Sequence, residues 1–213
     1  MKVSRTKASG SALLDPKSSV WGEAGSVAID LVPTPLAIAT EVSPFMALSD
    51  DHGKVSKLQV SALHNGKDIA FRLTWRSDEK NEIKNLDQFA DAAAIMFAMS
   101  DDASAITMGS KGKPVNSWLW RAGHDDPADV LAEGFSTSLR RKSSESELKT
   151  KSDYGDGQWS VILERPLRAG KGFVKMAAGG RSRVAFAVWE GSNDERAGRK
   201  SFSGEFIDME LEA

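Results

Sequence analysis

The residues best suited to hold a cofactor cluster in one stretch of the sequence, ITMGSKGKPVNSWLWR at positions 106–121. Met108 and Gly109 open a loop of small and basic residues there, and a methionine thioether is a soft, neutral metal ligand. Trp118 and Trp120 follow in a predicted strand, where residues two apart share a face. Two neighbouring indoles suit core packing or the wall of a pocket for a planar group. The pattern indicates a pocket and leaves its occupant open.

Other kinds of site are poorly represented in the sequence. There are no cysteines, which excludes disulfides, iron–sulfur clusters, thiolate zinc sites and thiol nucleophiles in this chain. The three histidines, at positions 52, 64 and 124, are not spaced with a second histidine or a carboxylate in a metal-binding pattern. No phosphate-binding glycine loop and no nucleophile elbow is visible. We therefore do not expect a free-standing enzyme.

The charge and hydropathy of the sequence argue against nucleic acid as a partner and against a membrane span. The net charge is −2 and the basic residues are scattered, so nucleic acid is not an expected partner. No window approaches 18 consecutive apolar residues, so no membrane span is predicted. The N-terminus, MKVSRTKASGSALL, is basic but lacks a continuous apolar segment, and we identify no secretory signal in it.

Short strands separated by turn residues must position these side chains. In residues 55–75, apolar and polar residues alternate on both sides of Asn65-Gly66, which is the strongest short-range signal for a β-hairpin. A second hairpin is predicted around Gly155-Asp156-Gly157, joining residues 145–153 to the run QWSVILERPL. Further strands are expected at 27–32, 93–99, 115–121, 183–191 and 202–211.

Helix signals are few. Asp125-Asp126-Pro127 before ADVLAEGF predicts one short helix, and residues 85–91 predict another turn. Many strands with little helix indicate a mainly β protein, an antiparallel β-sandwich with a few short helices in loops. We expect one domain over residues 1–213, with residues 1–20 as an extended arm and residues 31–54 as an irregular excursion over one end.

Several stretches of the chain together resemble a known family. From about residue 20 onward the sequence is similar to the γ subunit of ethylbenzene dehydrogenase, and to the γ subunits of dimethylsulfide dehydrogenase, selenate reductase and chlorate reductase. The stretches that carry the resemblance are EVSPFMALSD, VSALHNGKDIAFRLTW, AAIMFAM, ITMGSKGKPVNSWLW, VLAEGF, DGQWSVILERPL and RVAFAVWEGSNDERAGRKSFSGEF. The most specific are the Met-Gly stretch and the AVWEG stretch with the GRKS that follows it, and they resemble the hydrocarbon-oxidising branch most.

The resemblance implies a β-sandwich that holds one haem b through a methionine and a lysine. Met108 falls on the methionine of the Met-Gly loop. The lysine falls in ELKTKSDYGDGQW, where Lys149 fits best and Lys151 is the second choice because it shares the same face. Trp118, Trp120 and Phe135 are the candidate walls of the haem pocket. If strands 115–121 and 145–153 run antiparallel, Met108 and Lys149 share one edge of the sheet.

The resemblance also implies partners and a location. A catalytic molybdopterin (α) subunit would pass electrons through an iron–sulfur (β) subunit to this haem, and from there to an external acceptor such as a cytochrome. This chain would be a non-catalytic subunit of an oxidoreductase complex, most similar to those of anaerobic hydrocarbon hydroxylation. We expect it in the periplasm, exported together with a partner subunit. The 31–54 excursion and the 191–200 loop are the candidate contacts.

Two rival interpretations remain open at this stage. The sandwich also resembles sugar-binding domains, and paired exposed tryptophans stack on pyranose rings, so a carbohydrate-binding module without haem is the main alternative. A purely structural subunit that has lost its haem is the other.

Overall fold

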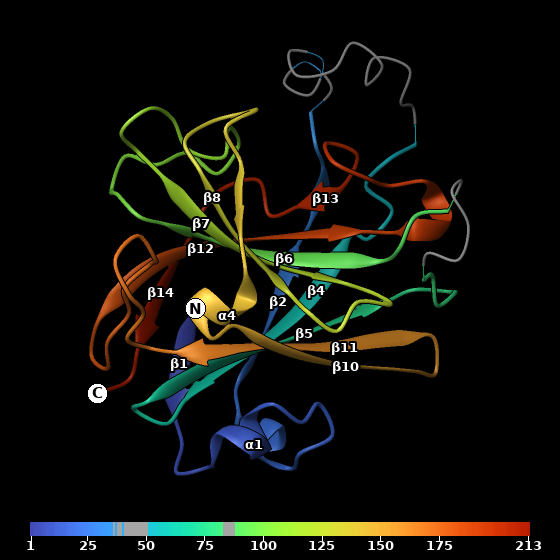
Figure 1. Ribbon diagram of the computed structural model, residues 1–213. Helices are drawn as coiled ribbons and strands as arrows, with labels where there is room; N and C mark the ends of the chain where they lie inside the picture. The colour runs from blue at the N-terminus through green and yellow to red at the C-terminus, as the bar shows by residue number, and fades with distance from the viewer. Residues whose placement is uncertain (36, 38–39, 41–50, 83–87) are drawn as a thin grey trace.

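The computed structural model describes the whole chain except residues 36, 38–39, 41–50 and 83–87, and its regular structure is mostly strand (Figure 1). The predicted mainly β fold with a few short helices is confirmed. The strands are β1 (Lys2–Arg5), β2 (Ser26–Asp30), β3 (Val32–Pro33), β4 (Lys57–His64), β5 (Asp68–Arg76), β6 (Ala92–Ala98), β7 (Val115–Arg121), β8 (Ala128–Ala132), β9 (Leu139–Arg141), β10 (Lys149–Gly155), β11 (Gln158–Pro166), β12 (Arg181–Trp189), β13 (Ser201–Phe202) and β14 (Ile207–Leu211). The short helices are α1 (Gly10–Leu13), α2 (Val20–Glu23), α4 (Ser143–Ser146) and the 3-10 turn η2 (Gly191–Asn193).

The strands form two layers that face each other across one core. We call sheet A the layer of β14, β12, β6, β7, β8 and β9, with β13 beside β12 and β3 beside β13, and sheet B the layer of β10, β11, β5, β4 and β2. Figure 1 shows sheet A above sheet B, with α1 beneath sheet B. Neighbouring strands within each layer run antiparallel, as predicted for a β-sandwich.

Both predicted hairpins are present. β4 and β5 pair from Gln59↔Thr74 to His64↔Ile69, and the Asn65 side chain closes the turn by accepting hydrogen bonds from the amides of Lys67 (3.0 Å) and Asp68 (2.8 Å). This use of an asparagine side chain to mimic backbone is typical of tight turns. β10 and β11 form the second hairpin, with Gly155 opposite Gln158.

The N-terminal residues do not form an arm, contrary to the prediction for residues 1–20. β1 pairs in parallel with β14 through Lys2 and Val3, and with β4 through Ser4 and Arg5, so it joins the two sheets. Val3 is fully buried. The four-residue strand KVSR lacks an apolar alternation, and its partners are distant in sequence, so no local pattern predicts it.

Three other local predictions were wrong or only partly testable. The segment expected as a helix after Pro127 is strand β8, which pairs with β7 from Val115↔Ala132 to Leu119↔Ala128. The last predicted strand, 202–211, is divided into β13 and β14. The helical turn expected at 85–91 falls partly outside the described residues, and its described part, residues 88–91, is not helical.

Alternation within the strands decides which residues form the core. Phe97, Trp118 and Phe186 of sheet A point inward and pack against Phe71 and Trp159 of sheet B, and each is at most 2% exposed. The indole of Trp118 lies 4.6 Å from the Phe97 ring, centroid to centroid. The complementary residues of sheet A, at alternate positions, must therefore point to its outer face.

Candidate functional site

The outer face of sheet A is lined by small side chains at its centre. Ala92 and Ala94 of β6, Ala185 of β12 and Ser117 of β7 all point outward, and each is between 4% and 8% exposed. Ser117 Oγ is buried and has no hydrogen-bond partner among the described residues. A β-sheet surface with so little side-chain volume lets the edge of a large group approach the backbone closely. We call these four residues the alanine floor.

Met108 stands at one end of this floor. Its side chain packs against Ala103, Val115 and Ala132, with Met96 beside them, so the thioether belongs to the outer side of sheet A. The residue has φ +57°, a left-handed conformation that is unusual for methionine and costs about 1 kcal/mol or more. Strain of this kind is concentrated at functional sites, where surrounding structure enforces it.

The loop around Met108 enforces this conformation by hydrogen bonds. The Met108 amide donates to Ala105 O (3.2 Å), and Met108 O accepts from the Gly134 amide (3.0 Å). Gly109 follows with φ +82°, and a Cβ atom there would lie 2.6 Å from Lys113 O, so only glycine fits. The Met-Gly pair is thus a structural unit that fixes where the thioether can reach.

Lys200 stands at the other end of the same face. It directly precedes β13, which pairs with β12 through Val188↔Ser201, so its side chain falls beside Trp189. Its Nζ lies 5.3 Å from the centroid of the Trp189 ring. No hydrogen bond or ion pair of Nζ occurs within the described part of the chain. Burial lowers the pKa of the Lys200 amine to about 8, because removing the ammonium from water penalises the charged form.

The sheet register places Met108 and Lys200 on one face with the alanine floor between them. Trp189 is opposite Ala92, at one end of β6, whereas Met96 and Ala98, which pack against the same small cluster as Met108, lie toward the other end. Four to six residues of strand correspond to about 13–20 Å along the sheet. The thioether and the partly buried amine therefore lie at opposite ends of the alanine floor, on the same side of sheet A.

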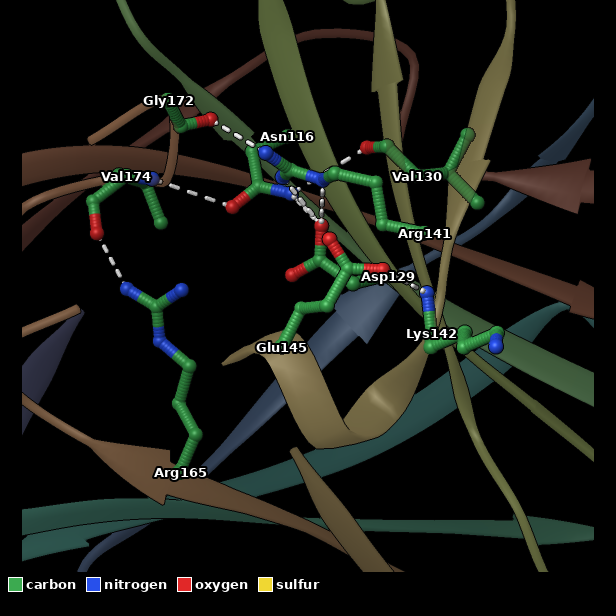
Figure 2. Close-up of polar contacts among 9 residues, drawn as sticks. All are labelled: Asn116, Asp129, Val130, Arg141, Lys142, Glu145, Arg165, Gly172 and Val174. Carbon is green, nitrogen blue, oxygen red and sulfur yellow. Dashed lines mark hydrogen bonds and ion pairs between the residues drawn. The ribbon is translucent and has the colours of Figure 1, made fainter. Parts of the chain in front are cut away.

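A polar cluster supports β7 from the inner side, beneath this face (Figure 2). Asn116 of β7 donates to Asp129 Oδ1 (2.9 Å) and accepts from the Val174 amide (3.1 Å). Arg141 pairs with the same Asp129 carboxylate, which is fully buried, and Arg165 donates to Val174 O. These contacts tie β7, β8, β9 and the segment before β12 together, so they stabilise the strand that carries part of the floor.

The sequence matches a known family over most of its length. Residues 18–146 and 136–201 match the family model described as ethylbenzene dehydrogenase. The chain belongs to this family. The resemblance seen in the Met-Gly and AVWEG stretches is thereby confirmed for the family.

Three relatives support the assignment to the ethylbenzene dehydrogenase family. A proposed respiratory nitrate reductase haem subunit, ORF7, of Haloferax mediterranei is 32% identical over 193 residues, 88% of this chain and 65% of the relative. The chain thus spans just under two thirds of that protein. The γ subunit of dimethylsulfide dehydrogenase of Rhodovulum sulfidophilum is 30% identical over 91% of this chain and 73% of the relative. The γ subunit of chlorate reductase of Ideonella dechloratans is 30% identical over 90% and 77%.

Solved structures resemble the fold of this family member. A family 9 carbohydrate-binding module of Caldicellulosiruptor kristjanssonii, in complex with glucose, superposes with a TM-score of 0.54 at 9% identity, over 100% of this chain and 96% of that one. A proposed carbohydrate-binding protein of Bacteroides uniformis superposes with a TM-score of 0.59 at 10% identity, over 100% and 98%. At such low identity the likeness concerns the β-sandwich alone.

The structure does not bring Met108 and Lys149 together, which corrects the predicted shared edge. Lys149 begins β10 in sheet B, opposite Glu164. That side of sheet B is its outer face, because Gly10 of α1 lies over the Glu164 carboxylate. Lys151 is on the same face, where its Nζ lies 3.7 Å from Asp15 Oδ1. Both lysines are exposed and are separated from Met108 by the two sheets and the core.

Of the three residues predicted as pocket walls, two lie in the core and one lies near Met108. Trp118 and Trp120 point into the core and are at most 2% exposed, so they neither line the face that holds Met108 nor offer a surface for sugar stacking. Phe135 follows Gly134, which is hydrogen-bonded to Met108, and it is partly buried. Phe135 as a wall therefore stays a prediction.

Sequence reasoning missed Lys200, although a signal was present. Lys200 lies in GRKS, within one of the two most specific family-like stretches. Its position two residues before Phe202, which faces outward opposite Ala187, assigns it to the outer face once β13 is recognised. The loss of solvent that changes its pKa could not be read from the sequence.

Proposed function

We propose that this chain is the haem b electron-transfer subunit of a periplasmic molybdenum enzyme complex of the ethylbenzene dehydrogenase type. One observation carries the proposal: in a member of this family, a strained methionine and a lysine with a lowered pKa stand at opposite ends of a floor of small side chains. The names of the relatives support it, since two are γ subunits of redox enzymes and one is a haem subunit.

The donor set fits a haem that carries electrons. Met108 and Lys200 would hold the iron, and the haem would supply a one-electron carrier. The Lys200 amine must lose its proton to act as a ligand, and its lowered pKa, about 8, reduces the cost of that loss. A thioether is a soft ligand that raises the potential of a haem. With two protein ligands, small molecules are excluded from the metal, and only outer-sphere electron transfer remains.

Other arrangements of metal ligands receive less support. In the described residues, no group of three or more His, Asp or Glu side chains is placed to hold a metal ion. In the same residues, no helix combines the length and apolarity needed to cross a bilayer.

The proposed partners are a molybdopterin α subunit, an iron–sulfur β subunit and an external acceptor such as a cytochrome. Electrons taken from substrate by the α subunit would pass through the β subunit to this chain. Hydrocarbon hydroxylation is the proposed activity of the complex, because the sequence stretches most resemble that branch. Location in the periplasm, with export alongside a partner subunit, remains part of the proposal.

A visible spectrum of the complex purified from its host tests the proposal. Reduction with dithionite is expected to give sharp α and β bands, and the pyridine haemochrome should identify haem b with one haem per copy of this chain. A complex that contains this chain without porphyrin would contradict the proposal. So would iron that is ligated by histidine.

A further inference from the structure

The backbone of Lys200 is held from one side by a single residue, Thr34. The Thr34 amide donates to Lys200 O (3.1 Å), and its hydroxyl donates to the same oxygen (3.3 Å). Thr34 O is in turn hydrogen-bonded to Nε2 of His52 (2.7 Å). The position of Lys200 therefore depends on where Thr34 and His52 are placed.

A buried carboxylate fixes the segment that follows His52. Glu195 is 1% exposed, and its Oε1 accepts hydrogen bonds from the amides of Gly53 (2.7 Å) and Lys54 (2.9 Å). Its Oε2 accepts from the Glu190 amide (2.9 Å). We call Glu195 with these three amides the Glu195 clamp. It links residues 53–54 to the loop that carries Lys200.

The clamp reaches Lys200 through close backbone contacts. Gly53 has φ +82°, and a Cβ atom on it would lie 2.6 Å from Pro33 Cα, so the two backbones are in direct contact. Pro33 is paired with Ser201 in the ladder between β3 and β13. Lys200 immediately precedes Ser201. A change at Glu195 would thus be transmitted through Gly53 and Pro33 to the start of β13.

The same loop holds the other side of the lysine. The Trp189 indole, over which the Lys200 amine lies, donates from Nε1 to Ala197 O (3.1 Å). Ala197 has φ +48°, so this loop adopts a conformation that needs support from its surroundings. Glu195, two residues earlier, is the buried anchor of the loop.

We propose that Glu195 is the positioning residue for Lys200, which acts through the Glu195 clamp to hold the amine of that lysine where it ligates the haem. The inference rests on the proposed function, because the ligand role of Lys200 is part of it. Three amide donors converge on one buried carboxylate whose ionised form is acceptor-only, and an amide side chain cannot replace it fully, since its NH2 group cannot accept. Glu195→Gln therefore loses the bond from the Glu190 amide while keeping the size of the side chain.

Carbon monoxide binding to the reduced holo complex reports the position of Lys200, because a second protein ligand excludes it. Wild-type complex is expected to bind none. Glu195→Gln should weaken the lysine ligation about tenfold, as expected for the loss of one charge-assisted hydrogen bond, and should give a CO-bound fraction with its shifted Soret band. Gly53→Ala should do the same by a separate route, because its Cβ would displace Pro33.

Asp129→Asn is the matched control. Asp129 is also a fully buried carboxylate with several donors, but it lies in the inner cluster and not in the loop of Lys200. This variant should lose stability and remain inert to CO. Lys200→Ala is the positive reference, which should bind CO completely.

The outcomes separate the two claims. If Lys200→Ala binds CO while Glu195→Gln and Gly53→Ala keep the wild-type spectrum and bind none, the proposed function stands and the positioning role of Glu195 is wrong. The role is also wrong if Asp129→Asn binds as much CO as Glu195→Gln. If Lys200→Ala itself remains inert to CO with its haem bound, the ligand assignment fails, and the inference about Glu195 fails with it.

Discussion

The two outer faces of this sandwich are built from the same kind of strand and are used in opposite ways. On sheet B, the residues Ala70 and Ile162 are covered by the N-terminal helices, with Leu13 and Trp21 packed against them. On sheet A, the alanine floor lies between a strained methionine and a partly buried lysine. One face is closed by its own chain, and the other presents the two proposed haem ligands.

The lysines of the two faces show what distinguishes the proposed ligand from a surface charge. Lys151 makes an exposed ion pair with Asp15, and Lys149 is exposed opposite Glu164. The side chains of both lysines are exposed to solvent. Lys200 lies against Trp189 without a carboxylate partner among the described residues, and burial lowers its pKa to about 8. Desolvation, and not the presence of a lysine on a strand, makes an amine available to a metal.

The largest effect is expected from filling the alanine floor with a bulky side chain. Ala94→Phe is expected to reduce haem retention by at least about tenfold, because a ring would occupy the space above the floor. The chain should stay folded. Ala70→Phe on sheet B is the matched change, and it should cost about 1–3 kcal/mol of stability by overpacking under α1 and α2 while keeping the haem. Haem-to-protein ratio and thermal unfolding measure the two effects. Equal haem loss in both variants would contradict the difference between the faces.

Removing the thioether should lower the reduction potential of the haem. Met108→Ala is expected to lower it by roughly 60–120 mV, one to two powers of ten in the preference for ferrous iron. Potentiometric titration of the purified complex gives the value. Met108→Gly should show the same shift, but its free energy of unfolding should be about 1 kcal/mol higher than that of Met108→Ala, because glycine adopts φ +57° without strain. An unchanged potential in both variants would remove Met108 from the ligand set.

Stability should depend on pH through Glu190, which lies at the end of β12 beside the clamp. Burial, and then the neighbouring Asp91 charge, raise its pKa from 4.5 to about 7. Because the folded-state pKa is the higher one, the contribution of Glu190 is fully present below about pH 4.5 and is lost as pH rises through about 7. The loss amounts to at most about 3 kcal/mol. Denaturant unfolding of wild type and Glu190→Gln at pH 5 and pH 8 should show this slope in wild type only, and parallel pH profiles would contradict it.

The smallest effect is expected at Lys151. Lys151→Ala should change the free energy of unfolding by less than about 0.5 kcal/mol, because its ion pair with Asp15 is exposed on both sides. Urea denaturation measures this change. A loss of haem in this variant would instead revive the ligand role that the resemblance suggested for this strand.

The strands were predictable where the pattern was local. Asn65 sits between two alternating runs, and both the turn and the pairing of β4 with β5 follow from it. The segment after Pro127 shows the limit of local signals. Its Asp-Asp-Pro start matches a helix cap, but the pairing of Ala128–Ala132 with β7 outweighs that preference.

The proposed ligand pair could be predicted only in part, because the sequence does not say which layer a strand joins. Met108 was proposed from the resemblance of its Met-Gly loop to the family. Lys149 was chosen because the resemblance points to the strand before the Asp-Gly hairpin, yet the chain crosses from sheet A to sheet B between Arg141 and Lys149, through α4. Lys200 needed the pairing of β13 with β12 and the burial beside Trp189, both of which arise only in the folded chain.

The most direct test of the account compares two lysines in the same complex by the low-spin ferric signal of the haem in electron paramagnetic resonance. Lys200→Ala is predicted to abolish the wild-type signal and give a high-spin or differently ligated haem. Lys149→Ala is predicted to leave the wild-type signal unchanged. The reverse result, with the signal lost in Lys149→Ala and kept in Lys200→Ala, would contradict the placement of the haem on the outer face of sheet A.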